Sequence, residues 1–159
     1  MKKRAYFVIL SFIFPLLVFS QNFADKDYYL VDSLEIDKIS EADKALIDSS
    51  LILFYQAKDD TNRIHIINTI VDEVEGETIW PKYNWWVYNF AQQQLEAHPT
   101  EKVKRKLMFL LARSMHSLGS YEKGNGDYRK ALSWYKKSLK ISETFKDKKF
   151  MSATVGNIA

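Results

Sequence analysis

The chain has 159 residues, about the size of one domain, and contains no cysteine. The absence of cysteine excludes disulfides, thiolate metal sites and thiol nucleophiles. The formal net charge of +3 comes entirely from Lys2, Lys3 and Arg4, because residues 21–159 carry 20 basic and 20 acidic side chains. This balanced remainder lacks the electrostatic footprint of a protein that binds nucleic acid or an anionic membrane.

Residues 1–20 have the layout of a secretory signal peptide. Basic residues precede an uncharged run over residues 5–19, and the modest side chains of Val18 and Ser20 favour cleavage after Ser20. The run is shorter than the about 20 apolar residues that a membrane-spanning helix needs, and Pro15 interrupts it. We therefore expect export with cleavage, and the alternatives are an uncleaved anchor or a buried N-terminal helix. Cleavage and anchoring both place the remainder in the periplasm or at the membrane facing it.

The remainder of the chain predicts an all-α fold. Residues 21–39 show no regular pattern and are expected to form an irregular segment. Ser40 is suited to cap a helix that runs to about Ala57, and the segment over residues 59–61 is expected to end this helix and cap the next one. A single apolar stripe predicts this second helix, and its members are Ile64, Ile67, Ile70, Val71 and Val74.

A third helix is expected to begin at Pro81, because proline is tolerated at the first position of a helix, and to end before Pro99. It contains five aromatic residues, Tyr83, Trp85, Trp86, Tyr88 and Phe90. These are too many for one face, so we expect rings to pack against neighbours on both sides and others to lie at the surface. A platform for a sugar or peptide is the alternative. The helical region over residues 40–98 is interpreted as divergent repeats or an unrelated helical cap.

A fourth helix is predicted from Thr100 to a turn around Gly124 and Gly126. Its apolar stripe comprises Val103, Leu107, Leu110, Leu111, Met115 and Leu118. A fifth helix follows Asp127 and carries two apolar rows, one with Tyr128, Ala131, Leu132, Tyr135 and Leu139 and the other with Trp134, Ser138, Ile141 and Phe145. Two rows are typical of a helix that packs between its hairpin partner and the next hairpin.

Residues 118–135 resemble the tetratricopeptide repeat. The matching residues, which would define the repeat structurally, are Leu118, Gly119, Gly126, Ala131 and Tyr135. Gly119 removes a side chain where the two helices cross, Ala131 permits close packing, and Tyr135 fills the space beneath. The sequence departs from the family pattern at Met115 and Tyr121.

The resemblance implies a helical hairpin over residues 100–146 and the first helix of a further, incomplete repeat over residues 148–159. Leu118 and Ile158 occupy equivalent positions 40 residues apart, compared with the family's basic period of about 34. The implied architecture is a short α-solenoid of antiparallel helical hairpins. Val155 and Ile158 would lack a covering helix, so we expect self-association.

No sequence pattern predicts catalysis, a cofactor or a metal. His65, His98 and His116 lie far apart without metal-ligand spacing, and phosphate-binding and nucleophile-elbow motifs are absent. The acidic residues 72–77 lack the pattern of a calcium loop and favour a solvated helix end. The basic run over residues 102–106 lies on a predicted helix with apolar residues opposite, which favours a solvated face over a nucleic-acid contact.

The binding candidates lie on the fourth helix, opposite its packing stripe, and are Arg113, His116, Ser120 and Lys123. Plain helix surface is the alternative interpretation of these residues. We expect a non-catalytic protein–protein interaction scaffold outside the cytoplasm, whose partner is a protein segment or a second copy of the chain. A second hypothesis follows from the resemblance to exported N-terminal parts of Bacteroidetes repeat proteins: a sensory portion of a membrane-bound histidine kinase or transcriptional regulator. A periplasmic enzyme, the third class, has no supporting constellation.

Overall fold

The computed structural model describes residues 25–146 and 148–158, so the signal-peptide prediction and Ala159 lie outside the described residues. The described residues are helical and contain no β-strand, which confirms the all-α prediction. The α-helices are α1 (Lys26–Tyr29), α2 (Glu41–Gln56), α3 (Asp60–Glu73), α4 (Trp80–Glu96), α5 (Glu101–Gly124), α6 (Tyr128–Ser142) and α7 (Lys148–Ile158), and the 3₁₀ turns are η1 (Ile36–Lys38) and η2 (Glu143–Phe145). None of these helices combines the length and apolar character needed to span a bilayer.

The predicted helix starts are fixed by side-chain caps. Ser40 Oγ accepts a hydrogen bond from the Asp43 N–H at 3.1 Å, and Asp59 Oδ1 accepts one from the Asn62 N–H at 2.8 Å. Both bonds satisfy backbone donors that the first helical turn leaves unpaired. The start of α4 differs by one residue from the prediction, because Trp80 precedes Pro81 within the helix.

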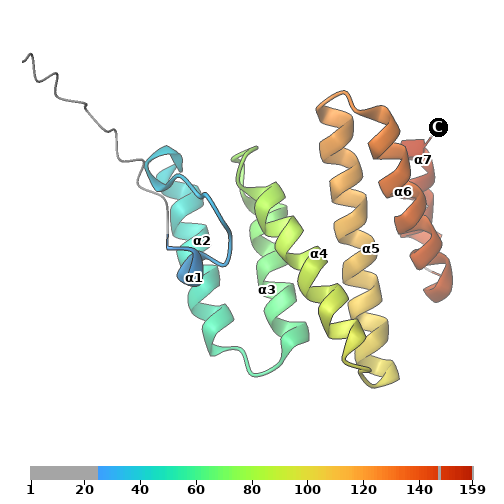
Figure 1. The fold of residues 1–159 in the computed structure, drawn as a ribbon, viewed down its shortest axis with the longest axis horizontal. Coiled ribbons are helices and arrows are strands. Elements are labelled where there is room, and N and C mark those ends of the chain that lie inside the picture. The colour runs from blue at the N-terminus through green and yellow to red at the C-terminus, as the bar shows by residue number, and fades with distance from the viewer. Residues whose placement is uncertain (1–24, 147, 159) are drawn as a thin grey trace, which may run out of the picture.

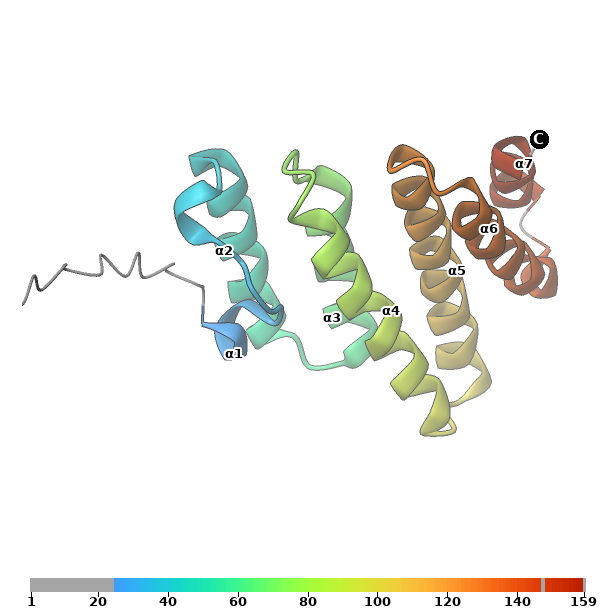
Figure 2. The ribbon, with the colours of Figure 1, turned by 45° about the horizontal axis from the view of Figure 1, so that its top comes forward.

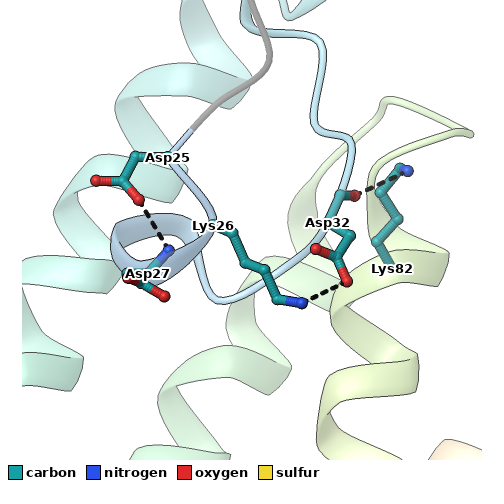
Figure 3. Close-up of polar contacts among 5 residues, drawn as sticks. All are labelled: Asp25, Lys26, Asp27, Asp32 and Lys82. Atoms are coloured by element: carbon teal, nitrogen blue, oxygen red, sulfur yellow. Dashed lines mark hydrogen bonds and ion pairs between the residues drawn. The ribbon is translucent and has the colours of Figure 1, made fainter.

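The N-terminal segment is more ordered than the expected irregular stretch. It contains α1 and η1, and it contributes Val31 and Leu34 to the buried core. Figure 3 shows how it is held: Lys26 Nζ contacts Asp32 Oδ2 at 2.8 Å, and Lys82 Nζ of α4 donates to the Asp32 carbonyl at 3.2 Å. Helices of three or four residues are too short to produce a hydrophobic period, which explains why the sequence pattern missed them.

The helices from α2 to α7 follow one another side by side in chain order and form two rows (Figures 1 and 2). We call α3, α5 and α7 the odd row, and α2, α4 and α6 the even row. In the odd row, Arg113 of α5 pairs with Asp72 of α3, and the ring centroids of Phe109 of α5 and Phe150 of α7 are 6.1 Å apart. In the even row, Phe54 of α2 contacts Trp86 of α4.

The aromatic residues of α4 pack toward neighbours on both sides, as the sequence predicts. Tyr83 is fully buried, and Trp86 packs edge-to-face on Phe54 of α2 with ring centroids 5.4 Å apart. On the other side, Trp85 and Tyr88 both contact Trp134 of α6, at 5.6 and 5.5 Å. These contacts confirm the inter-helix packing interpretation of the rings.

The α5–α6 hairpin brings the predicted small and aromatic residues together. Leu118, Ala131 and Tyr135 are buried, and a Cβ atom added at Gly119 would lie 2.6 Å from Tyr135 Cε1. Gly126 has a φ of +80°, a conformation that glycine adopts without strain. The close approach of α5 to α6 therefore depends on the missing side chain at Gly119.

One residue of the predicted apolar rows does not pack. Tyr128 is 69% exposed, which corrects its placement in the first row. It is the first residue of α6 and lies almost one turn before Ala131, the first buried residue of that helix. At the other end of the described chain, Val155 is 49% exposed and Ile158 is half-buried.

Candidate binding surface

Arg113 forms an ion pair with a residue of α3. Its Nη2 donates to both carboxylate oxygens of Asp72, at 2.8 and 3.0 Å. The two side chains are 31% and 49% exposed, so water weakens the attraction between them. The pair nevertheless fixes the position of the guanidinium beside α3, where it lines a cavity between α3 and α5.

His116 faces the other side of α5. Its Nδ1 lies 3.1 Å from Thr154 Oγ1 of α7, and its ring lies 5.3 Å from the ring of Tyr135 and 5.5 Å from that of Phe150. Burial among these groups disfavours the charged imidazolium and lowers the pKa of His116 below its ordinary value. His116 therefore links α5, on which it lies, to α6 and α7.

Ser120 and Lys123 occupy further positions along α5. Ser120 Oγ lies 3.2 Å from the Tyr135 hydroxyl and donates to the His116 carbonyl at 3.3 Å. Lys123 is exposed and lines a cavity of about 300 Å³ together with Ile158. Arg113, Ser120 and Lys123 line three separate cavities. The structure therefore does not bring the predicted binding residues together in one site.

A larger cavity lies elsewhere on α5, between its N-terminal half and η2. Its volume is about 950 Å³, and its lining residues are Glu101, Lys102, Lys104, Arg105, Lys106, Met108, Phe109, Thr144 and Phe145. The basic residues are exposed, whereas Met108, Phe109 and Phe145 are half-buried. The cavity thus combines a basic rim with an apolar floor.

A second cavity of about 370 Å³ adjoins the first on the side of α3. It shares Lys106 and Phe109 with the larger cavity, and its remaining lining residues are Asp59, Thr61, Asn62, His65, Leu110 and Arg113. Because the two cavities have lining residues in common, they lie next to each other along α5. We call the two cavities together the odd-row groove.

The charge of the odd-row groove is predominantly positive. Five basic side chains line it, compared with the two carboxylates of Glu101 and Asp59, and one of the five, Arg113, is paired with Asp72 outside the lining. Lys104 pairs with Glu101 at 3.4 Å. Hydrogen bonds from the Thr61 hydroxyl and the Asn62 N–H, with a smaller contribution from the Lys106 charge, lower the pKa of Asp59. The side chains of Lys102 and Arg105 have no hydrogen bond or ion pair with any described residue.

The sequence pattern identified the basic run over residues 102–106 but not the groove. A basic helix face is usually solvated, and the run alone contains nothing to contradict that interpretation. The apolar floor depends on Phe145, which lies in η2, and on the packing that brings η2 beside the start of α5. This juxtaposition is a tertiary property without a local sequence signal.

Comparisons with protein-family models, curated protein sequences and solved structures gave no match.

The burial of His116 predicts that stability decreases in mild acid. Because the folded-state pKa lies below the ordinary value of 6.5, its contribution is fully present above that value and decreases as the pH falls below it. We expect chemical denaturation to show a smaller free energy of unfolding at about pH 5 than at about pH 7, and His116→Gln to reduce the difference. His65→Gln, at an exposed position, is the matched control. Equal pH dependence in the wild type and His116→Gln would contradict the prediction.

Proposed function

We propose that the chain is a non-catalytic protein-binding module, a short α-solenoid resembling tetratricopeptide repeats, that acts outside the cytoplasm. The observation that carries the proposal is a recurring sequence separation between residues that contact each other across neighbouring helices of the odd row. Asp72 and Arg113, which join α3 to α5, are 41 residues apart, and His116 and Thr154, which join α5 to α7, are 38 residues apart. Both offsets are close to the 40-residue spacing between Leu118 and Ile158 in the sequence.

A regular offset between neighbouring helices supports the proposal because solenoids repeat one packing unit along the chain. Each unit contacts mainly its neighbours, and the stacked helices present an extended surface to a partner. In this chain the odd-row groove crosses such a surface, between α3, α5 and η2. Binding by shape and by burial of surface requires no reacting group. The location outside the cytoplasm is supported by the signal-peptide pattern of residues 1–20.

Selection of peptides from a random phage-displayed library on the full chain tests this function. We expect enrichment of related peptides whose binding is weakened by Lys106→Glu, because Lys106 lines both cavities of the groove. The matched control is Lys140→Glu on α6, an exposed lysine of the even row. Failure to enrich any peptide would refute the proposal, as would enriched peptides that bind the Lys106→Glu and wild-type proteins equally.

A further inference from the structure

We propose that the odd-row groove recognises an acidic protein segment that carries an aromatic or large aliphatic side chain. This inference rests on the proposed protein-binding function and specifies the chemistry of the partner. It combines two features of the groove, unpaired basic side chains at the rim and half-buried apolar side chains at the floor.

The rim supplies the charge selectivity. Lys102 and Arg105 are exposed and have no described partner, so their charges are available to a ligand. The basic excess in the groove is local, because residues 21–159 as a whole carry equal numbers of basic and acidic side chains. A cleft lined by one sign of charge attracts ligands of the opposite sign and raises their association rate. The preferred ligand is therefore negatively charged.

The floor supplies the apolar part of the recognition. Phe109 and Phe145 contact each other with ring centroids 6.1 Å apart, and Met108 lies beside them in the lining. All three side chains remain partly exposed. The volume of about 950 Å³ is sufficient for a large side chain together with its flanking backbone. An aromatic or large aliphatic residue would bury this floor and gain contact area with the rings and the thioether.

The shape of the groove and the partial burial of its phenylalanine rings favour a polypeptide over a nucleic acid. The two cavities adjoin at Lys106 and Phe109 and together extend along α5, which suits an extended segment. Proteins that bind single-stranded nucleic acids stack bases on available aromatic faces. Here Phe109 is half-buried and packs against both Phe145 and Phe150. Its remaining exposed part suits contact with a single side chain.

Fluorescence anisotropy with the full chain and a defined probe tests this inference. The probe is a labelled peptide with aspartates and glutamates on both sides of one central phenylalanine. We expect it to bind at low salt, and its affinity to fall as added salt screens the rim charges. Simultaneous Lys102→Glu and Arg105→Glu substitutions should weaken binding by about tenfold or more, because they turn two attractions into repulsions.

Three controls distinguish the contribution of charge to binding, the contribution of apolar contact, and the location of the binding site. A probe with alanine in place of phenylalanine should bind more weakly, and a probe with lysines in place of its acidic residues should not bind. The double substitution Lys136→Glu with Lys140→Glu changes the charge by the same amount at exposed positions of α6 and should leave binding unchanged. Circular dichroism of both double variants checks that their helices form.

The outcomes distinguish this inference from the function on which it rests. If library peptides bind the groove but are neutral or basic, the module function stands and the acidic preference is wrong. The acidic preference is also wrong if the acidic probe binds the wild type and the Lys102→Glu, Arg105→Glu variant equally. Tighter binding of a single-stranded oligonucleotide, or competition of the probe with self-association, would identify a nucleic acid or a second copy as the occupant instead. Either result would overturn the inference.

Discussion

Replacement of Gly119 by alanine is expected to lower the free energy of unfolding by about 2 kcal/mol, although alanine is the better helix former. The added Cβ would lie 2.6 and 2.7 Å from two ring carbons of Tyr135, distances that require one of the groups to move. Tyr135 is only 1% exposed and its hydroxyl contacts Ser120, so the ring has little room to turn. We expect α5 and α6 to separate slightly, which would loosen the packing between them. Urea unfolding followed by far-UV circular dichroism measures the effect.

Gly124 provides the matched control for this substitution. It is the last residue of the same helix, and an added Cβ would have no described heavy atom within 4 Å. Gly124→Ala should therefore be neutral or stabilise the fold by up to about 1 kcal/mol. Tyr135→Leu replaces the opposing ring with a shorter side chain. It should reduce the loss in free energy of unfolding that Gly119→Ala causes, because substitutions at residues in contact have non-additive effects. Equal stability of the two glycine variants would show that the predicted close approach does not exist.

The hairpin contact could be predicted from the sequence because its parts are local and chemically specific. A small residue near the end of one helix, a glycine turn and an aromatic on the next helix determine which faces meet. Gly119, Gly126 and Tyr135 occupy these positions in the structure. The cap at Ser40 and the presence of a cap within residues 59–61 were predictable for the same reason, since a capping side chain bonds backbone groups within a few residues, and the structure shows that Asp59 is the second cap.

The groove could not be predicted in this way. Its rim belongs to one helix, but its floor includes Phe145, which follows α6. The helical period of α5 distinguishes buried from exposed positions but does not reveal which distant segment lies beside them. The same limit applies to Arg113 and His116, which the sequence places on one open surface. In the structure they contact α3 and α7 respectively, through Asp72 and Thr154.

Ile67→Ala is expected to lower the free energy of unfolding by about 3 kcal/mol, because the substitution removes buried atoms and leaves a cavity. Ile67 is fully buried on α3, together with Ile64 and Ile70. This helix contacts α2, α4 and α5, so the surroundings of Ile67 are constrained from several directions and can collapse only in part. A loss of this size is a large fraction of the about 5–15 kcal/mol that stabilises a typical domain.

The matched control is Ile52→Ala on α2, where the side chain is 53% exposed and a change of less than about 0.5 kcal/mol is expected. Chemical denaturation should also show a single transition in both variants. The reason is that α5 contributes Leu107 and Leu111 to the core shared with α2, α3 and α4 while also forming the hairpin with α6. Loss of the core contacts would thereby release the hairpin as well. Two separate transitions, with only the first sensitive to Ile67→Ala, would instead show that the α5–α6 hairpin folds independently of the N-terminal helices.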